Sequence, residues 1–395
     1  MYYSKESFDV IMLIFGDYGF YQIVVLVATA ICWLLAIFCR KNPTNRIGKI
    51  GQPLPSAIAV ILPIVLAVAF AGLRKNVGDT FYYVHSYNGL PDSGNEVSLK
   101  LFIESSYTFW QNFFKNLTDD WQYLLMFSAI VSLPVPLIIL YEYSYPFDLA
   151  IVLFVFYGYL GGMMNGMRQY MAAAIVLCGT RFLFRVGGNR IANFIKYAAI
   201  ILLAYCMHNS AIVMLAIYFV VRRRAWQPSS LILILGSVFV TAIFDKLMPS
   251  FLHTLESTDY ASYSSNGWFD STGGSSVLRA LVCLMPILLA YFNRERMMMF
   301  GHIGDILINL AFINLALNII AIYNWIFVRV SIYLMIYFII FVCFVVYNTG
   351  ESDKRTLYYV LCLFAFFLFF RNQSYQIDEY QSNYIFPYKM LFAPR

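Results

Sequence analysis

The sequence predicts an all-α polytopic membrane protein with about 12 transmembrane helices. Its 395 residues are 61% hydrophobic and 12% charged, whereas a soluble domain carries about 25% charged residues. Aromatic residues make up 18% of the chain, and many tyrosines and tryptophans stand at the ends of apolar runs, where interfacial belts lie. We therefore expect a single integral membrane domain over residues 1–395.

The net charge of +6 and the seven cysteines fit this class. Cytoplasmic loops of membrane proteins are rich in Lys and Arg, so the charge implies no nucleic-acid partner. The cysteines lie in or beside apolar runs and form no CxxC pair. They are therefore expected to be small buried residues, and neither a disulfide framework nor a metal site is predicted.

The first span is expected at residues 20–39, which are long and apolar enough to cross a membrane. Acidic residues precede this run, whereas a cleavable signal peptide has a basic start. Basic residues follow it, namely Arg40, Lys41, Arg46 and Lys49. The positive-inside rule then predicts an outer N-terminus and a cytoplasmic loop after the span.

A long outer segment is expected at residues 74–120, after a second span at 55–73. Within it, residues 99–117 form an amphipathic pattern that predicts one helix lying on the outer membrane surface. Spans are then expected at 121–141 and 146–160, and Pro134 and Pro136 should kink the first of these.

A glycine-rich stretch at residues 161–166 separates the fourth span from a fifth at 167–184, and Arg168 and Gln169 follow it directly. An arginine within the membrane costs about 2.5–3.5 kcal/mol on insertion scales, so it normally faces protein or water and is a functional candidate. The glycines predict a break in the helix. The alternative is an external turn whose arginine only holds two helices together.

Residues 191–221 are apolar but have basic residues at both ends. Both ends should therefore be cytoplasmic, and the segment must go out and return, with its apex at residues 207–210. Each arm is short for a full span, which predicts that His208 is buried in the outer half of the membrane. The alternative is a helix-capping turn without chemistry.

The remaining spans are expected at 230–248, 277–292, 303–322, 326–347 and 356–370. Residues 249–276 should form an outer loop, and residues 371–395 an outer tail. Arg329 should lie one turn into the membrane from the outer side.

Four polar features converge at the outer leaflet in this topology: residues 74–83, the Arg168-Gln169 pair, His208 and Arg329. Fixed guanidinium groups suit a diphosphate or another multiply charged anion, because Arg binds phosphate oxygens in a bidentate fashion. A histidine can accept a hydroxyl proton at neutral pH, and Asp79 could orient that histidine or act as the base. Phosphate loops, dinucleotide fingerprints and zinc-protease motifs are absent from the sequence.

At these residues the chain resembles the EpsG family of membrane proteins. The resemblance is carried by residues 74–83 (RKNVGDTFYY), 167–172 (MRQYMA) and 208–211 (HNSA), by Arg329 with Tyr333, and by residues 386–389 (FPYK). It extends over nearly the whole chain in order and spacing. Gly78 and Asp79 are adjacent here, where the family often has one residue between them.

The resemblance implies a Wzy-like polysaccharide polymerase with a glycosyltransferase-C-like fold. Such proteins join undecaprenyl-diphosphate-linked repeat units into capsular, O-antigen or exopolysaccharide at the outer face of the bacterial cytoplasmic membrane. The implied partners are the lipid-linked glycan donor and acceptor, membrane lipids, a flippase and a chain-length regulator, with no cofactor and no metal. The implied catalytic residues are His208, Asp79 and Arg168, and the implied substrate-binding residues are Arg74, Tyr83, Gln169, Arg329 and Tyr333.

Two other functions remain open. A flippase or transporter of the lipid-linked unit would also place arginines in a cavity, but it should show charges along the whole crossing and a pseudo-repeat. A membrane O-acyltransferase would use a central histidine that is reachable from the cytoplasm. The clustering of ionisable groups on one side favours an enzyme that opens to the outer leaflet.

Overall fold

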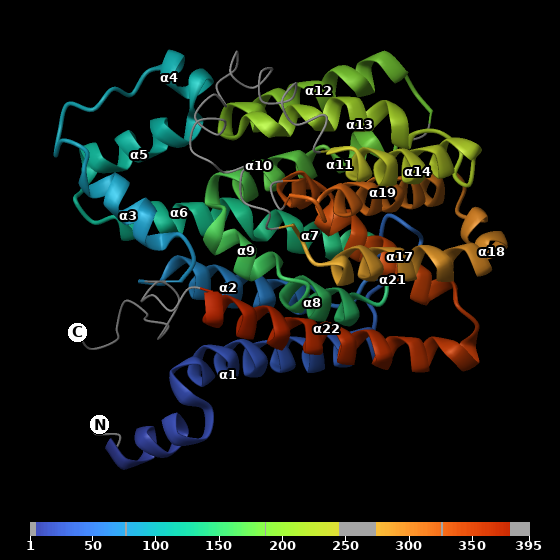
Figure 1. Ribbon diagram of the computed structural model, residues 1–395, viewed down its shortest axis with the longest axis horizontal. Coiled ribbons are helices and arrows are strands. Elements are labelled where there is room, and N and C mark those ends of the chain that lie inside the picture. Colours follow the sequence, from blue (N-terminus) through green and yellow to red (C-terminus); the bar gives the residue numbers. More distant parts are fainter. Residues whose placement is uncertain (1–4, 76, 186, 245–273, 325–326, 380–395) are drawn as a thin grey trace. The chain divides into compact units, whose positions relative to one another are not determined.

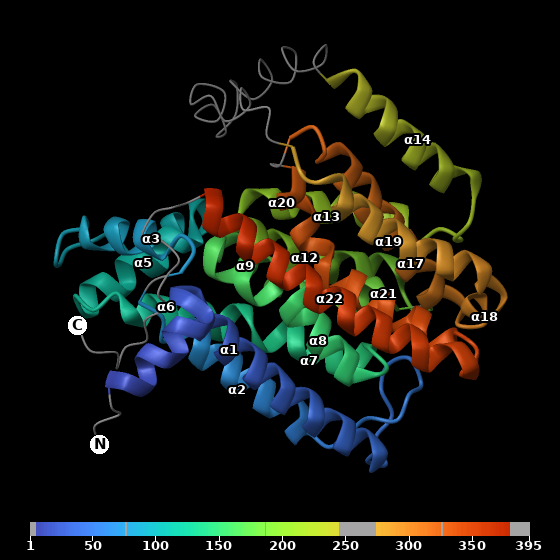
Figure 2. The same ribbon diagram turned by 60° about the horizontal axis from the view of Figure 1, so that its bottom comes forward.

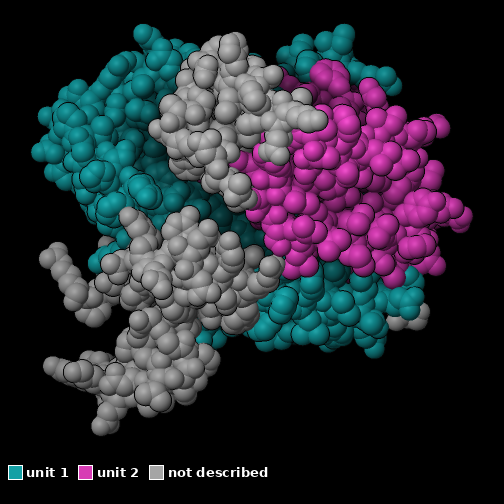
Figure 3. Space-filling view, in the orientation of Figure 1, with its two compact units in different colours: residues 1–182, 189–213, 350–395 teal, residues 183–188, 214–349 magenta. Residues whose placement is uncertain are grey.

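The computed structural model of the protein describes residues 5–75, 77–185, 187–244, 274–324 and 327–379. The regular secondary structure of the described residues is helical, apart from one isolated bridge between Ile47 and Pro53 (Figure 1). The all-α prediction is therefore confirmed. The chain divides into two compact units, coloured in Figure 3: residues 1–182, 189–213 and 350–395 form the first, and 183–188 and 214–349 the second.

Six stretches of the described chain are helical, long and apolar enough to cross a membrane, and five shorter apolar helices accompany them. This agrees with a multi-pass membrane protein, while the count of about 12 spans stays a prediction. The six are Ile23–Lys41, Gln122–Tyr143, Phe147–Asn165, Arg190–Met207, Gly301–Ile320 and Val328–Asn348.

In the first unit, helix α22 (Glu351–Glu379) returns to the start of the chain and lies beside α8 (Phe147–Phe156) and α1 (Lys5–Lys41) in Figures 1 and 2. The outward side of α1 is an apolar stripe with a spacing of three or four residues, as a lipid-facing helix requires. The exposed stripe consists of Val27, Ile31, Leu34 and Phe38.

A buried polar cluster joins these three helices on their inner side. The Tyr358 hydroxyl donates to a carboxylate oxygen of Asp148, the indole N–H of Trp33 donates to the Tyr358 hydroxyl at 2.6 Å, and Arg40 approaches the other Asp148 oxygen to 3.3 Å. Polar groups buried among apolar helices are stable only when they are paired in this way. The cluster therefore attaches α22 to α1 and α8.

Helices α2 (Ile58–Gly72), α6 (Gln122–Ser132) and α7 (Pro134–Tyr143) pack beside one another in the same unit. The expected interruption by Pro134 is confirmed, because α6 ends at Ser132 and Pro134 begins α7. Proline has no backbone N–H to continue the hydrogen-bond ladder, and the first turn of a helix is where it is favoured.

Residues 80–117 form a platform of three helices: α3 (Thr80–Asn88), α4 (Leu99–Glu104) and α5 (Ser106–Leu117). The single helix expected at 99–117 is divided, because Ser105 has φ −156° and ψ 87° and lies outside the helical region. Its hydroxyl accepts a hydrogen bond from the Thr108 N–H at 3.4 Å and so caps α5.

The α5 helix has its polar side turned inward. Its buried residues are Ser106, Tyr107, Gln111, Asn112 and Lys115. Its other aromatic residues are only half-buried, namely Phe109, Trp110, Phe113 and Phe114. On that aromatic side, Trp110 lies 4.6 Å from Phe127 of α6, measured between ring centroids. A polar inner face and an apolar outer face are the reverse of a soluble helix. The orientation of α5 agrees with the amphipathic helix expected from the sequence, and its place on the membrane surface stays a prediction.

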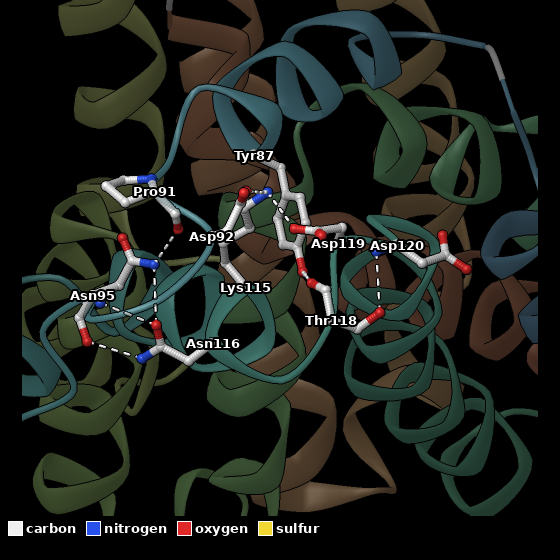
Figure 4. Close-up of polar contacts among 9 residues, drawn as sticks. All are labelled: Tyr87, Pro91, Asp92, Asn95, Lys115, Asn116, Thr118, Asp119 and Asp120. Carbon is white, nitrogen blue, oxygen red and sulfur yellow. Dashed lines mark hydrogen bonds and ion pairs between the residues drawn. The ribbon is translucent and has the colours of Figure 1, made fainter.

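The buried Lys115 side chain connects the elements of the platform (Figure 4). Its side chain is 4% exposed and its ammonium group lies 2.8 Å from Asp119, 3.1 Å from Asp92 and over the ring of Tyr87. The hydrogen bond to Asp119 raises the pKa of Lys115 and lowers the pKa of Asp119. Asn116 donates to the Asn95 carbonyl at 2.9 Å. These contacts hold the loop after α3 against α5.

Interrupted helices follow in the first unit. Gly158, at φ 102°, separates α8 from α9 (Tyr159–Asn165), and Gly166 separates α9 from α10 (Met167–Cys178). The predicted break in the glycine-rich stretch is thus confirmed at Gly166. Short α11 (Thr180–Leu183) comes next, and α12 (Arg190–Met207) packs against α10 and is followed by η1 (Asn209–Ile212).

The second unit is built around α19 (Gly301–Ile320), which packs against three other apolar helices. Asn309 of α19 donates to the carbonyls of Val221 and Arg223 at 3.0 and 2.8 Å, and Asp305 accepts from the Ala225 N–H at 2.8 Å. The other elements are α13 (Val213–Val221), α14 (Pro228–Ala242), α17 (Val277–Phe292), α18 (Arg294–Met298), α20 (Val328–Ser331), η3 (Ile332–Leu334) and α21 (Met335–Asn348).

Three predicted segments lie wholly or partly outside the described residues. Most of the outer loop at 249–276 and the segment 386–389 lie outside the described residues. The outer tail was expected from residue 371, but α22 continues to Glu379, and residues 380–395 lie outside the described part.

Candidate active site

The candidate site is organised by the break between α9 and α10. The Tyr83 hydroxyl of α3 donates to the Asn165 carbonyl and accepts from the Met167 N–H, each at 3.1 Å. Both backbone groups belong to helix ends, which leave such groups without an intrahelical partner. Tyr83 therefore fixes the break and the first turn of α10, which carries Arg168 and Gln169.

The loop before α3 rests directly on the end of α9. Gly78 has φ 58°, and a Cβ atom placed there would lie 2.8 Å from the Met164 carbonyl oxygen. Val77 also has a positive φ, of 90°, which is strained for a β-branched residue. Glycine at 78 thus permits the close approach that brings Asp79 and Tyr83 to the break.

Arg74 is fully buried and connects three helices. Its Nε donates to the Thr80 hydroxyl at 2.8 Å, one Nη donates to the Ala71 carbonyl, and the other Nη lies 3.0 Å from the Met167 sulfur. The Gln122 side chain donates to the Arg74 carbonyl at 3.2 Å. This arrangement favours a positioning role for Arg74, and contact of its guanidinium with a substrate stays a prediction.

Arg168 is exposed at the first turn of α10. Its guanidinium carbon lies 5.6 Å from the ring centroid of Tyr107, which in turn lies 6.0 Å from the ring of Tyr83. Such a cation–π contact orients the guanidinium plane without neutralising its charge. Within the described residues, no carboxylate forms an ion pair with Arg168. The charge is therefore available to an anion.

The two phenols at this position remain protonated at neutral pH. Burial, and then the nearby Asp79, raise the pKa of Tyr83 to about 12, against the opposing effect of Arg168. Burial likewise raises the pKa of Tyr107 well above its usual range. Both hydroxyls therefore keep their protons next to a positive charge.

The neighbouring Gln169 leads to His208 through a serine. Gln169 is 4% exposed, and its side-chain amide donates to the Ser210 hydroxyl at 3.4 Å. That hydroxyl lies 2.8 Å from His208 Nδ1. Ser210 is a site residue that the sequence analysis did not single out, although it stands in the HNSA segment.

His208 ends α12 in an extended conformation, at φ −156° and ψ 117°, and its Nδ1 accepts a hydrogen bond from the Ser210 N–H at 3.4 Å. The capping geometry considered for residues 207–210 is thus confirmed. Because a backbone N–H can only donate, Nδ1 acts as the acceptor and a neutral ring carries its proton on Nε2. The chemical role of His208 stays a prediction.

Tyr107 is the second site residue that sequence reasoning missed. It stands on the amphipathic segment, where its aromatic ring suggests an interfacial anchor. Its position on the polar face, four and eight residues before Gln111 and Lys115, is the signal that could have separated it from the lipid-facing aromatics.

Arg329 and Tyr333 belong to the second unit. Arg329 is half-buried in α20, and Tyr333 is buried in η3. Their part in the site stays a prediction. Among the described residues, no group of three His, Cys, Asp or Glu side chains is placed to hold a metal ion.

Comparison with known proteins identifies the chain's relatives at the level of the family. A model of the EpsG family matches residues 57–390. The chain belongs to the EpsG family. The match covers α2 and the three segments that carry the candidate site in the first unit, so the EpsG resemblance inferred from the motifs is confirmed. No curated protein and no solved structure matches the chain.

Proposed function

We propose that this EpsG-family protein polymerises undecaprenyl-diphosphate-linked oligosaccharide repeat units into capsular, O-antigen or exopolysaccharide. The reaction takes place at the outer face of the bacterial cytoplasmic membrane, where a flippase supplies the units and a chain-length regulator limits the product. One observation carries the proposal. Arg168 and Gln169 are consecutive in the first turn of α10. Arg168 presents an exposed guanidinium group, and Gln169 is linked to His208 through the Ser210 hydroxyl.

The reaction exchanges a glycosyl–phosphate bond for a glycosidic bond. The bond between the anomeric carbon of the donor glycan and its phosphate oxygen breaks, and a new bond forms to a hydroxyl oxygen of the acceptor unit. The acceptor proton passes to a base of the site, and undecaprenyl diphosphate leaves with the bonding electron pair. Arg168 offsets the negative charge that develops on the leaving diphosphate.

Two residues are candidates for the proton acceptor. Asp79 stands at the start of α3, does not cap that helix through its side chain, and lies close enough to Tyr83 to influence its pKa. His208 Nδ1 accepts from the Ser210 N–H, so the Nε2 of a neutral ring carries the proton and is a donor rather than a base. The geometry therefore favours Asp79 as the base and His208 as a hydrogen-bonding group.

The decisive experiment incubates the purified protein with lipid-linked repeat units and resolves the products on a gel. We expect a ladder of polymers from the native protein and a loss of about 100-fold or more with Arg168→Lys, since a point charge does not replace a bidentate fork. The matched control is Arg181→Lys, an exposed arginine over the Phe182 ring at 4.5 Å, which should polymerise normally.

Native activity in Arg168→Lys would remove the arginine from the mechanism. If the native protein forms no ladder but moves the labelled glycolipid across a liposome membrane, the flippase alternative holds. Transfer of an acyl group to the glycan would instead identify an O-acyltransferase.

A further inference from the structure

The Tyr107 hydroxyl is a buried polar group that the site described so far does not use. Tyr107 is 5% exposed, and its hydroxyl has no hydrogen-bond partner among the described residues. A buried donor without a partner lowers the stability of a folded protein. A buried donor without a partner in a native protein needs an explanation, and binding a ligand is one.

The surroundings of this hydroxyl indicate the charge of the ligand. Arg168 stands over the Tyr107 ring, and both Arg168 and the buried Arg74 lie close enough to favour negative charge at the hydroxyl. The neighbouring Tyr83 hydroxyl is already occupied by the Asn165 carbonyl and the Met167 N–H. Tyr107 is thus a donor in a positive environment, next to an exposed guanidinium.

The position of Tyr107 is fixed from both ends of the platform. The capped start of α5 lies one residue before it, and Lys115, two turns later, is held by Asp92 and Asp119 (Figure 4). A donor held in place before its ligand arrives loses little conformational entropy on binding. The ring of a tyrosine on a mobile surface would not offer this advantage.

We propose that the Tyr107 hydroxyl donates a hydrogen bond to a phosphate oxygen of the lipid-linked diphosphate, beside the oxygens that Arg168 binds. This inference rests on the proposed function and adds a second binding residue to its site, contributed by the platform. The hydrogen bond strengthens as negative charge collects on the leaving diphosphate, because bonds to ionised acceptors are stronger than neutral ones.

Tyr107→Phe tests the proposal because it removes the hydroxyl and keeps the ring under Arg168. The matched control is Tyr159→Phe, since Tyr159 of α9 is also fully buried and its hydroxyl also has no partner among the described residues. Each protein is placed in nanodiscs of neutral lipid. The measurements are thermal unfolding and affinity for undecaprenyl diphosphate, undecaprenol and inorganic diphosphate.

We expect Tyr107→Phe to unfold at or above the native temperature, because a buried donor without a partner has been removed. Its affinity for undecaprenyl diphosphate should fall by about tenfold or more, as for a lost hydrogen bond to a charged group. Its affinity for undecaprenol should not change, and Tyr159→Phe should bind all probes as the native protein does.

The probes also separate the sources of the ligand. A fall for undecaprenyl diphosphate alone assigns the hydroxyl to a membrane-borne diphosphate, and a fall for inorganic diphosphate as well assigns it to the diphosphate group from either source. Unchanged affinity for both overturns the proposal, and so does an equal fall for undecaprenol. A native protein that binds diphosphate through Tyr107 but forms no polymer would overturn the polymerase function and leave this site standing.

Discussion

At the scale of single residues, burial separates two arginines that the sequence makes equivalent. Arg74 and Arg168 both stand in family segments and both suit a diphosphate. Arg74 is buried and bonded to Thr80, Ala71 and Met167, whereas Arg168 is exposed over an aromatic ring. Substitution of Arg74 should therefore reduce mainly stability, and substitution of Arg168 should reduce mainly activity.

Arg74→Ala should lower the free energy of unfolding by about 2–4 kcal/mol, because it removes hydrogen bonds of a charged group and leaves a cavity. Arg168→Ala should cost only about 0.5–1 kcal/mol, the value of an exposed cation–π contact, yet abolish the polymer ladder. Thermal unfolding in detergent, beside the gel assay, measures both effects. Equal destabilisation by the two variants would contradict this distinction.

Substitutions of His208 and Asp79 test which of the two residues takes the acceptor proton. If Asp79 takes the acceptor proton, Asp79→Asn should reduce polymerisation by about 100- to 10,000-fold. His208→Gln should retain more activity, because its amide oxygen can accept the Ser210 N–H that His208 Nδ1 now accepts. Initial rates of ladder formation decide between them. A larger loss in His208→Gln than in Asp79→Asn would make the histidine the base.

At the scale of elements, the loop before α3 sets the break that presents Arg168. The strongest constraint is Gly78, whose position combines a left-handed φ with a close approach to the backbone of α9. Gly94 in the following loop also has a positive φ, of 79°, but nothing lies within 4 Å of the place where its Cβ atom would be. Substitutions at the two glycines therefore distinguish the effect of backbone strain alone, at Gly94, from strain combined with a steric clash, at Gly78.

Gly94→Ala should cost about 1–2 kcal/mol of stability, the strain of a left-handed residue, without a specific loss of activity. Gly78→Ala should cost more, because the new methyl group would press on the Met164 carbonyl at 2.8 Å and shift Tyr83 from the break. Polymerisation should therefore fall further than the loss of folded protein accounts for. Unfolding curves and specific activity of the folded fraction give the comparison, and similar behaviour of the two variants would rule out the contact.

At the scale of the whole molecule, sequence patterns predicted those features that depend on residues close together in the chain. Apolar runs predicted the helices, Pro134 and Gly166 predicted breaks, and the order of the motifs predicted the EpsG family. The burial of Arg74 and the place of Tyr107 could not be predicted, because they depend on contacts between residues far apart in the chain, for which the sequence has no periodic signal. The division of the helix at Ser105 has a local cause, the serine cap on the Thr108 N–H.

The cluster of Asp148, Tyr358, Arg40 and Trp33 is the clearest case, because Trp33 and Tyr358 are 325 positions apart. Such a buried network should stabilise the protein by more than the sum of its individual hydrogen bonds. In a double-mutant cycle, Asp148→Asn and Tyr358→Phe should show a coupling free energy of about 0.5–3 kcal/mol. Chemical denaturation of the two single variants and the double variant measures it.

Both single variants should also make α22 more sensitive to protease, since the cluster attaches this helix to α1 and α8. The matched control is Tyr359→Phe, an exposed tyrosine on the same helix, which should leave denaturation and cleavage unchanged. Strictly additive effects of Asp148→Asn and Tyr358→Phe would mean that the two side chains stabilise the protein independently and not as one network.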